Sequence, residues 1–199
     1  EPTDEARTGT TIKWRPDLEV FTAIDIPDDW YRETMRRQAV VNANFTFRLR
    51  IEGQDGVFSE EEFCYPKGIE DYVMEKVGHD YLTEPFFIQA DRRGRDRDDL
   101  PDYNVKITAC LCFSRTFQMQ EYYHNSSWLE NGGSPEKAAR SALTSALDAY
   151  IKQQGKYNKN ESAIKWQDVQ DCLVLVTNCF STQTSYENQT KKAINNRFI

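Results

Sequence analysis

The sequence predicts a protein of the α+β class, in which strands form sheets and a few helices cover them. Residues 43–52 and 105–113 alternate apolar and polar side chains, which is the period of a strand with one buried face. Residues 172–180 form a nearly continuous apolar run of strand length, typical of a strand that is covered on both faces. Apolar residues between 139 and 151 recur with the three-then-four spacing of a helix face. Strands with a few covering helices indicate the α+β class.

The first part of the chain is expected to hold a strand, a helix and a hairpin. Residues 10–14 predict a short strand that ends before Pro16, since the residue preceding a proline is disfavoured in the helical region. A helix is expected to begin just after Pro27, where a proline and acidic side chains suit a first turn. The strand at 43–52 is expected to turn at residues 54–56 and to return over 57–65.

The middle of the chain is expected to alternate a helix, a loop and two strands. Residues 68–77 predict a short helix with its apolar side chains inward. Residues 92–102 mix four arginines with four aspartates, and we interpret them as a solvated loop. The alternating strand at 105–113 is expected to have a neighbour at 117–124.

The last part is expected to hold the longest helix and the most buried strand. Ser134, followed by a proline and a glutamate, predicts a helix N-cap, and Gly155 predicts the end of that helix. Residues 166–171 are expected to form a brief helix before the apolar strand at 172–180. A further helix is predicted from Asn188.

The amino-acid composition and net charge exclude some classes of function. The 199 residues include 25 Lys and Arg and 32 Asp and Glu, giving a formal net charge of −7. This acidic balance argues against a free-standing nucleic-acid binder. The apolar runs are too short to cross a bilayer. We expect no targeting segment, one domain with a piece of another, and a chain excised from a longer protein.

Cysteine and histidine usage favours a packing role over a metal site. Five cysteines are too sparse for a disulfide scaffold, so we expect reduced, mostly buried thiols. Cys110 and Cys112 share one strand face but lack two further ligands nearby, and no metal is expected. Four glycosylation sequons leave a secreted glycoprotein as a weaker alternative; they begin at Asn44, Asn125, Asn160 and Asn188.

Two loop-to-helix junctions are candidate anion sites, because the free amides of a helix N-terminus attract negative charge. Gly132, Gly133 and Ser134 form the first, although helix capping alone also explains them. In the second, Gln189 and Lys191 offer an amide donor and a point charge suited to a phosphate, although a lone lysine is often merely solvated.

Residues at these and other positions, in matching order along nearly the whole chain, resemble one protein family. It comprises the B subunits of DNA gyrase and topoisomerase IV, the ATP-driven type IIA topoisomerases. The similar segments are Thr8-Gly9-Thr10, Trp14 to Thr22, Tyr65 to Val73, Asn131 to Ser134, Arg140 to Tyr150, and Glu187 to Lys191.

The resemblance implies a fold and a division into domains. The fold would be the transducer's two-layer α+β sandwich, shared with GHMP kinases and containing a left-handed βαβ crossover. Residues 1–22 would be the final strand and exit segment of a preceding ATPase domain, and residues 23–199 the transducer domain.

The resemblance also assigns roles to three residues. Gln189 and Lys191 would contact the ATP γ-phosphate in the adjoining ATPase domain, with Lys191 as the catalytic cation. Arg140 would face the cavity through which DNA passes, although a solvated helix arginine is an equal interpretation. The complete cytoplasmic enzyme would use ATP and Mg²⁺, with none bound to this piece alone. Its partners would be DNA, the A subunit, a second B subunit and the adjoining ATPase domain, with no membrane.

Three departures from the family pattern leave an alternative open. Pro135 stands where the family usually has histidine, and Lys67 replaces one glycine of a Gly-Gly-Ile segment. Residues 181–186 replace a Pro-x-Pro-x-Phe segment that precedes the Gln-Thr-Lys loop. A non-enzymatic interaction module that keeps the fold without the nucleotide switch is therefore the alternative.

Overall fold

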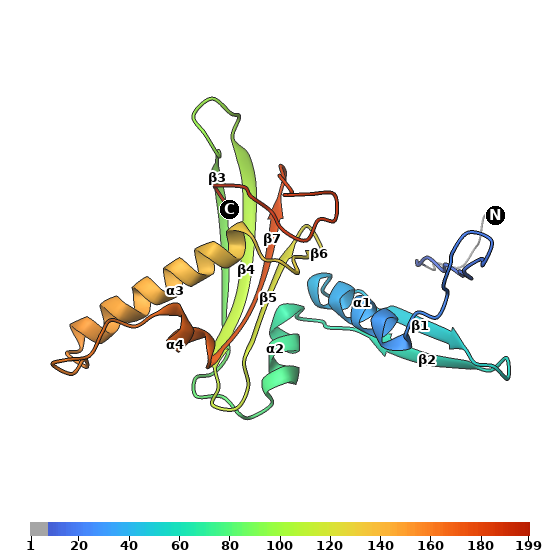
Figure 1. The fold of residues 1–199 in the computed structure, drawn as a ribbon, viewed down its shortest axis with the longest axis horizontal. Helices are drawn as coiled ribbons and strands as arrows, with labels where there is room; N and C mark the ends of the chain where they lie inside the picture. The colour runs from blue at the N-terminus through green and yellow to red at the C-terminus, as the bar shows by residue number, and fades with distance from the viewer. Residues whose placement is uncertain (1–7) are drawn as a thin grey trace.

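The computed structural model describes residues 8–199 and confirms the predicted α+β class (Figure 1). The helices are α1 (Asp28–Val41), α2 (Ile69–Val77), α3 (Ser134–Gln153) and α4 (Trp166–Gln170). The strands are β1 (Phe47–Glu52), β2 (Phe58–Phe63), β3 (Phe86–Gly94), β4 (Tyr103–Phe113), β5 (Met119–His124), β6 (Ser127–Trp128) and β7 (Leu173–Ser181). Most of the predicted helices and strands are present. They lie where the sequence patterns place them, and their ends differ from the prediction by a few residues.

The strands form two sheets. β1 and β2 make a separate antiparallel hairpin, and the other strands make a five-stranded sheet in the order β3-β4-β7-β5-β6. β4 is antiparallel to both β3 and β7, whereas β5 is parallel to β7. The chain passes through α3 between these two parallel neighbours, so β5, α3 and β7 form a βαβ crossover (Figure 1).

Helices lie on both faces of the five-stranded sheet. On one face, Cys110 and Val176 pack with α2 and the end of α1. On the other face, Leu173 and Leu175 pack with α3 and α4. The apolar run of β7 makes this possible, because successive side chains of a strand point to opposite faces. The chain thus has one layer more than the two-layer sandwich that the resemblance implied.

Two local predictions for the part of the chain before β4 are wrong. Residues 10–14 form no strand: residues 8–27 contain no helix or strand, and nothing in the described part of the chain supplies ladder hydrogen bonds to them. The predicted loop at residues 92–102 is partly strand, because Arg92 and Arg93 belong to the edge strand β3 and pair with Val105 and Asn104 of β4. An edge strand tolerates charged side chains on its exposed positions.

Helix α3 begins differently from its prediction and covers less of the sheet. Gly133 is its N-cap, and Ser134 lies in its first turn, where its hydroxyl donates to the Ile194 carbonyl over 3.3 Å. Of the apolar stripe, Leu143 and Leu147 are half-buried, whereas Tyr150 is exposed. In Figure 1 the helix extends away from the sheet toward its C-terminus, which explains the exposure.

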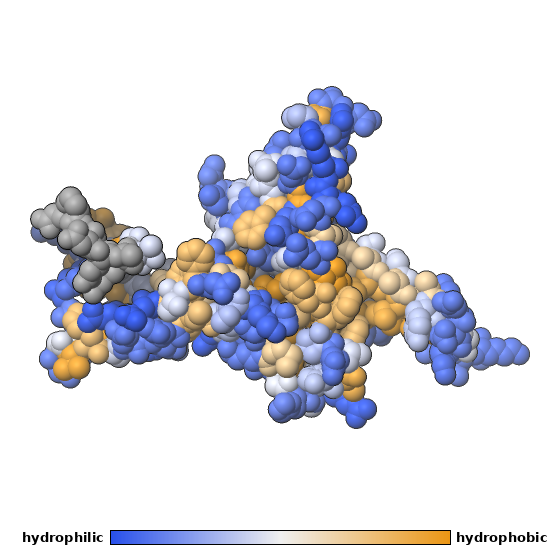
Figure 2. All heavy atoms as spheres, turned by 180° about the vertical axis from the view of Figure 1, so that it is seen from behind, coloured by the Kyte–Doolittle hydropathy of each residue, from blue (hydrophilic) through white to orange (hydrophobic). Residues whose placement is uncertain are grey.

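The surface carries several large apolar side chains outside the core. Figure 2 shows hydrophobic residues gathered over the centre of the molecule and hydrophilic residues at its extremities. In the segment before α1, Trp14 and Phe21 are exposed.

The first seven residues of the predicted exit segment, 1–22, lie outside the described residues. No helix within residues 8–199 combines the length and hydropathy of a membrane span.

Candidate functional site

Gln189 and Lys191 lie on a short loop, residues 187–193, after strand β7. Below this loop, Tyr186 and Ile194 form an antiparallel bridge, and the Glu187 amide donates to the Ala193 carbonyl over 3.0 Å. Beside the tip, the Lys191 amide donates to the Asn188 carbonyl over 3.2 Å. The loop is therefore closed by backbone hydrogen bonds at its base and bears the two predicted residues near its tip.

The helix predicted from Asn188 is absent, and local hydrogen bonds explain why. The Asn188 side-chain oxygen accepts the Thr190 amide over 3.1 Å, which is an Asx turn. Such a side chain offers the backbone a partner that competes with a helix. Lys191 has a φ of 57°, in the left-handed region, which ends any right-handed helical turn there.

The loop presents its polar groups to solvent. Gln189 and Lys191 are both exposed. The Lys191 Nζ lies 5.6 Å from the ring centroid of Tyr186, within the range of a cation–π contact. The next cation, Lys192, is instead paired with Glu130. Within residues 8–199 no carboxylate forms an ion pair with Lys191, so its ammonium group is available to an anion.

The returning strand of the loop packs closely on the start of helix α3. Gly133 forms a parallel bridge with Ile194, and the Ser134 amide donates to the Ile194 carbonyl over 2.9 Å. A β-carbon at Gly133 would lie 2.2 Å from that carbonyl oxygen, so only glycine fits. The first candidate junction, residues 132–134, therefore supports the loop through its backbone, and nothing in the structure assigns it an anion.

A buried polar network holds the chain on both sides of the loop. Asn196, 1% exposed, accepts the Ser185 amide over 2.7 Å and donates to Asp96 over 3.1 Å. The Tyr103 hydroxyl and the Phe198 amide also donate to Asp96, over 2.6 and 2.8 Å. Burial by itself would raise the pKa of Asp96, but these hydrogen bonds outweigh it and lower the pKa. The loop therefore rests on a fixed base.

The sequence gives no local signal for this network. Asp96 lies in the segment interpreted as a solvated loop, and Asn196 lies 100 residues away from it. Both are ordinary polar residues in their local context. Only the pairing of β3 with β4 and the return of the chain after the 187–193 loop bring them together.

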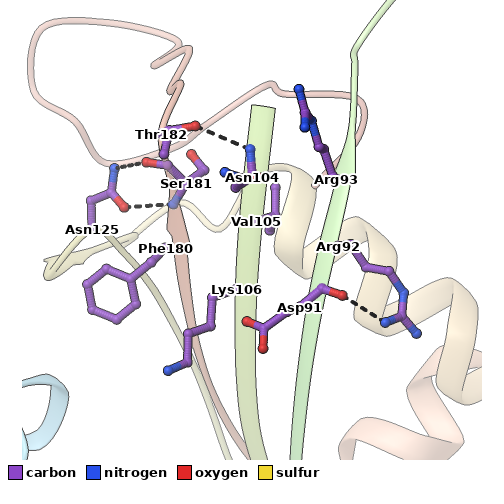
Figure 3. A pocket seen from close by; sticks show the side chains of 10 residues that line it. All are labelled: Asp91, Arg92, Arg93, Asn104, Val105, Lys106, Asn125, Phe180, Ser181 and Thr182. Atoms are coloured by element: carbon purple, nitrogen blue, oxygen red, sulfur yellow. Dashed lines mark hydrogen bonds between the residues drawn. The ribbon is translucent and has the colours of Figure 1, made fainter. Parts of the chain in front are cut away.

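An open hollow of about 660 Å³ lies on the sheet beside the segment that leads to the loop (Figure 3). Asp91, Lys106 and Phe180 project into it from three neighbouring strands. Asn125 borders it and hydrogen-bonds the backbone of Ser181 in both directions, over 3.0 and 3.1 Å. None of the three predicted site residues lines this hollow.

Arg140 lies apart from the loop, in the second turn of α3. Its guanidinium pairs with Glu136 over 2.8 Å and lies 5.5 Å from the ring centroid of Trp166. It also lines a polar cavity of about 160 Å³ with Tyr122 and Trp166. Arg140 is about half exposed, so it remains accessible to a large anion. The structure brings Gln189 and Lys191 together on one loop and places Arg140 elsewhere.

The cysteines have the features of core residues. All five lie in the described part of the chain as free thiols, and three are buried. Burial raises the pKa of the Cys110 thiol to about 12, which makes it a poor metal ligand and nucleophile at neutral pH. Within residues 8–199 no three His, Cys, Asp or Glu side chains gather as a metal site.

Known structures share this fold. The chain superposes on the 43K ATPase domain of Thermus thermophilus gyrase B with a TM-score of 0.60 and 21% identity, covering 92% of this chain and 46% of that one. For the B-subunit of the DNA gyrase from Myxococcus xanthus, the TM-score is 0.65 at 15% identity, with 90% and 47% covered.

Sequence comparison agrees. The DNA gyrase B protein of Campylobacter jejuni is 23% identical over 194 residues, which cover 97% of this chain and 24% of that protein. The chain therefore spans about a quarter of that relative's length. The sequence profile of the DNA gyrase B family matches residues 68–199, well over half of the chain and including the 187–193 loop. The chain belongs to the DNA gyrase B family.

Proposed function

We propose that this chain is the transducer region of the B subunit of an ATP-dependent type IIA topoisomerase, and that residues 187–193 sense the γ-phosphate of ATP. Residues 23–199 would form the transducer domain, with the left-handed crossover of that fold, and residues 1–22 would lead in from the ATPase domain. The observation that supports this proposal most strongly is the exposed amide of Gln189 and ammonium of Lys191, on a loop whose base is fixed by hydrogen bonds of the buried Asn196.

The exposed tip of the loop is suited to make one contact with a nucleotide that a neighbouring domain holds. Gln189 supplies a neutral donor, and Lys191 supplies a point charge that a phosphate oxygen attracts. ATP, when bound with Mg²⁺ in the adjoining ATPase domain, supplies the phosphoryl group that is transferred to water. Lys191 would stabilise negative charge on that group, and docking of the loop would exclude water and strengthen this effect.

The same contact would convert nucleotide state into domain movement. A loop that binds only while the γ-phosphate is present makes the angle between the two domains depend on ATP. Nearly complete switching requires a differential affinity of roughly 5.5 kcal/mol between the two states. The anchored base matters here, because a force on the tip is transmitted to α3 and the sheet through Gly133 and Asn196.

The complete protein would act in the cytoplasm on DNA, as a B-subunit homodimer with an A subunit. The test is to incubate it with the A subunit, plasmid and ATP, and to measure the plasmid linking number. We expect a change that needs ATP hydrolysis, whereas this chain alone should hydrolyse nothing. If ATP left the linking number unchanged while both subunits bound DNA, the chain would be better described as a non-enzymatic interaction module.

We further propose that Arg140 contacts DNA phosphates within the closed dimer. Replacing Arg140 with glutamine should weaken DNA binding and reduce the slope of log affinity against log salt by about 0.9, the loss of one phosphate contact. Lys152→Gln is a matched control, because Lys152 lies on the same helix and also pairs with a carboxylate four residues before it. Equal salt slopes for the two variants would show that Arg140 is only a solvated helix residue.

A further inference from the structure

A buried histidine lies beneath the segment that leads into the 187–193 loop. We propose that His124 is a positioning residue for this loop: its ring fixes the approach segment, residues 181–186, and thereby the direction in which Lys191 points. The proposal rests on the function proposed above for Lys191. It concerns the segment that differs from the family's proline-containing pattern, where another means of fixing the backbone is needed.

The His124 ring lies within hydrogen-bonding distance of the approach segment. His124 ends strand β5 and is fully buried. Its Nε2 lies 2.8 Å from the Thr184 hydroxyl oxygen and 3.2 Å from that of Ser181, both in the approach segment. Ser181 also donates to the Gln183 carbonyl over 2.6 Å. One imidazole nitrogen therefore lies close to two hydroxyl groups of a segment that contains no proline. Because Ser181 gives its single hydroxyl hydrogen to Gln183, the hydroxyl that can donate to this nitrogen is that of Thr184.

The residue that follows His124 reinforces the same contact. Asn125 donates to the Ser181 carbonyl over 3.1 Å and to the Thr184 hydroxyl oxygen over 3.0 Å. Because Thr184 accepts this bond, its own hydroxyl hydrogen is free to be donated to Nε2 of His124. Burial lowers the pKa of His124 to about 4, so the ring is neutral at pH 7 and can accept it.

Two successive ring contacts connect His124 to Lys191, the cation of the proposed function. The His124 ring meets the Tyr186 ring edge-on, with centroids 6.4 Å apart. The Tyr186 ring in turn lies beneath the Lys191 ammonium. His124 is thus two side-chain contacts away from Lys191, and a change in its position alters the surface on which Lys191 rests.

Core packing alone accounts poorly for a histidine at this position. Its Nδ1 is buried without a hydrogen-bond partner among the described residues, which is unfavourable. An aromatic hydrocarbon ring would fill similar space without that cost. The bond from Nε2 to the approach segment is what a hydrocarbon ring lacks, and this difference defines the test.

The test is a double-mutant cycle in the complete B subunit, with kcat and KM for ATP measured for each variant. His124→Phe keeps the ring but removes Nε2, and Thr184→Val removes the hydroxyl at nearly constant shape. We expect each change to lower kcat by about tenfold with little change in KM, and the double variant to lose no more than either single one. His124→Gln, which retains a hydrogen-bonding end, should recover part of the loss.

Two further measurements distinguish a loss of positioning from unfolding of the domain and from failure of the proposed function. Urea denaturation of each variant reports whether the domain that carries His124 is folded, so a reduced kcat in a variant with an unchanged unfolding transition reflects positioning and not unfolding. Independent, multiplying losses in the cycle, or wild-type kcat in both single variants, would overturn the role of His124. If Lys191→Ala also had wild-type turnover, the proposed function itself would be wrong; if only Lys191→Ala were impaired, this proposal alone would fail.

Discussion

Replacing Lys191 with alanine in the complete B subunit is expected to lower ATP turnover by about 100-fold or more. An electrostatic donor placed where charge develops in a transition state usually contributes an effect of this size. The KM for ATP should change far less, because the proposed contact is made by one loop and the rest of the nucleotide is bound elsewhere. The measurement is steady-state ATP hydrolysis with and without DNA.

Lys192→Ala is the matched control for this prediction. Lys192 is adjacent in sequence and also exposed, but its ammonium is paired with Glu130. Its removal should leave turnover near that of the unmodified protein. If Lys191→Ala behaved like Lys192→Ala, the charge at residue 191 would have no part in hydrolysis.

The second large effect is expected at Gly133, where Gly133→Ala should lower the free energy of unfolding by at least about 3 kcal/mol. The residue has φ 93° and ψ −140°, a conformation that side chains strongly disfavour. A β-carbon there would also overlap the Ile194 backbone, with its nitrogen at 2.8 Å in addition to its oxygen. Because this overlap involves backbone atoms, side-chain repacking cannot relieve it.

Gly155→Ala separates the two contributions. Gly155 also has a positive φ, of 60°, but no heavy atom lies within 4 Å of the site where its β-carbon would be. This substitution should cost only the conformational term of about 1 kcal/mol. Urea denaturation of both variants measures the difference. Equal losses would show that the contact between α3 and the returning strand of the loop is looser than the structure indicates.

Elements defined by local periodicity could be predicted from the sequence. The alternation in β4 and the apolar run in β7 depend on neighbours two residues apart, and the stripe of α3 on neighbours three or four apart. These patterns record which face is buried. They do not record which elements bury it: the apolar run of β7 predicted coverage of both faces, but neither the helices that supply it nor the half-exposed course of α3 could be predicted.

The site was predictable only in part. Gln189 and Lys191 were identified from an expected helix N-terminus and from the resemblance of their segment to one in a known family, and the structure places both at an exposed tip. The predicted helix there was wrong, because the Asx turn and the bridges to Tyr186 and Gly133 outweigh local helix preference. His124 meets Thr184 only across 60 residues, so its contact with the approach segment leaves no sequence pattern.

Amide hydrogen exchange of residues 189–192 in the complete B subunit tests most directly whether this loop senses the γ-phosphate. The backbone at the exposed tip should exchange rapidly without nucleotide and with ADP. With a nonhydrolysable ATP analogue, we expect at least about tenfold slower exchange there, and Lys191→Ala should abolish the slowing. Equal exchange with ADP and with the analogue, in a protein that binds both, would contradict a γ-phosphate contact at this loop.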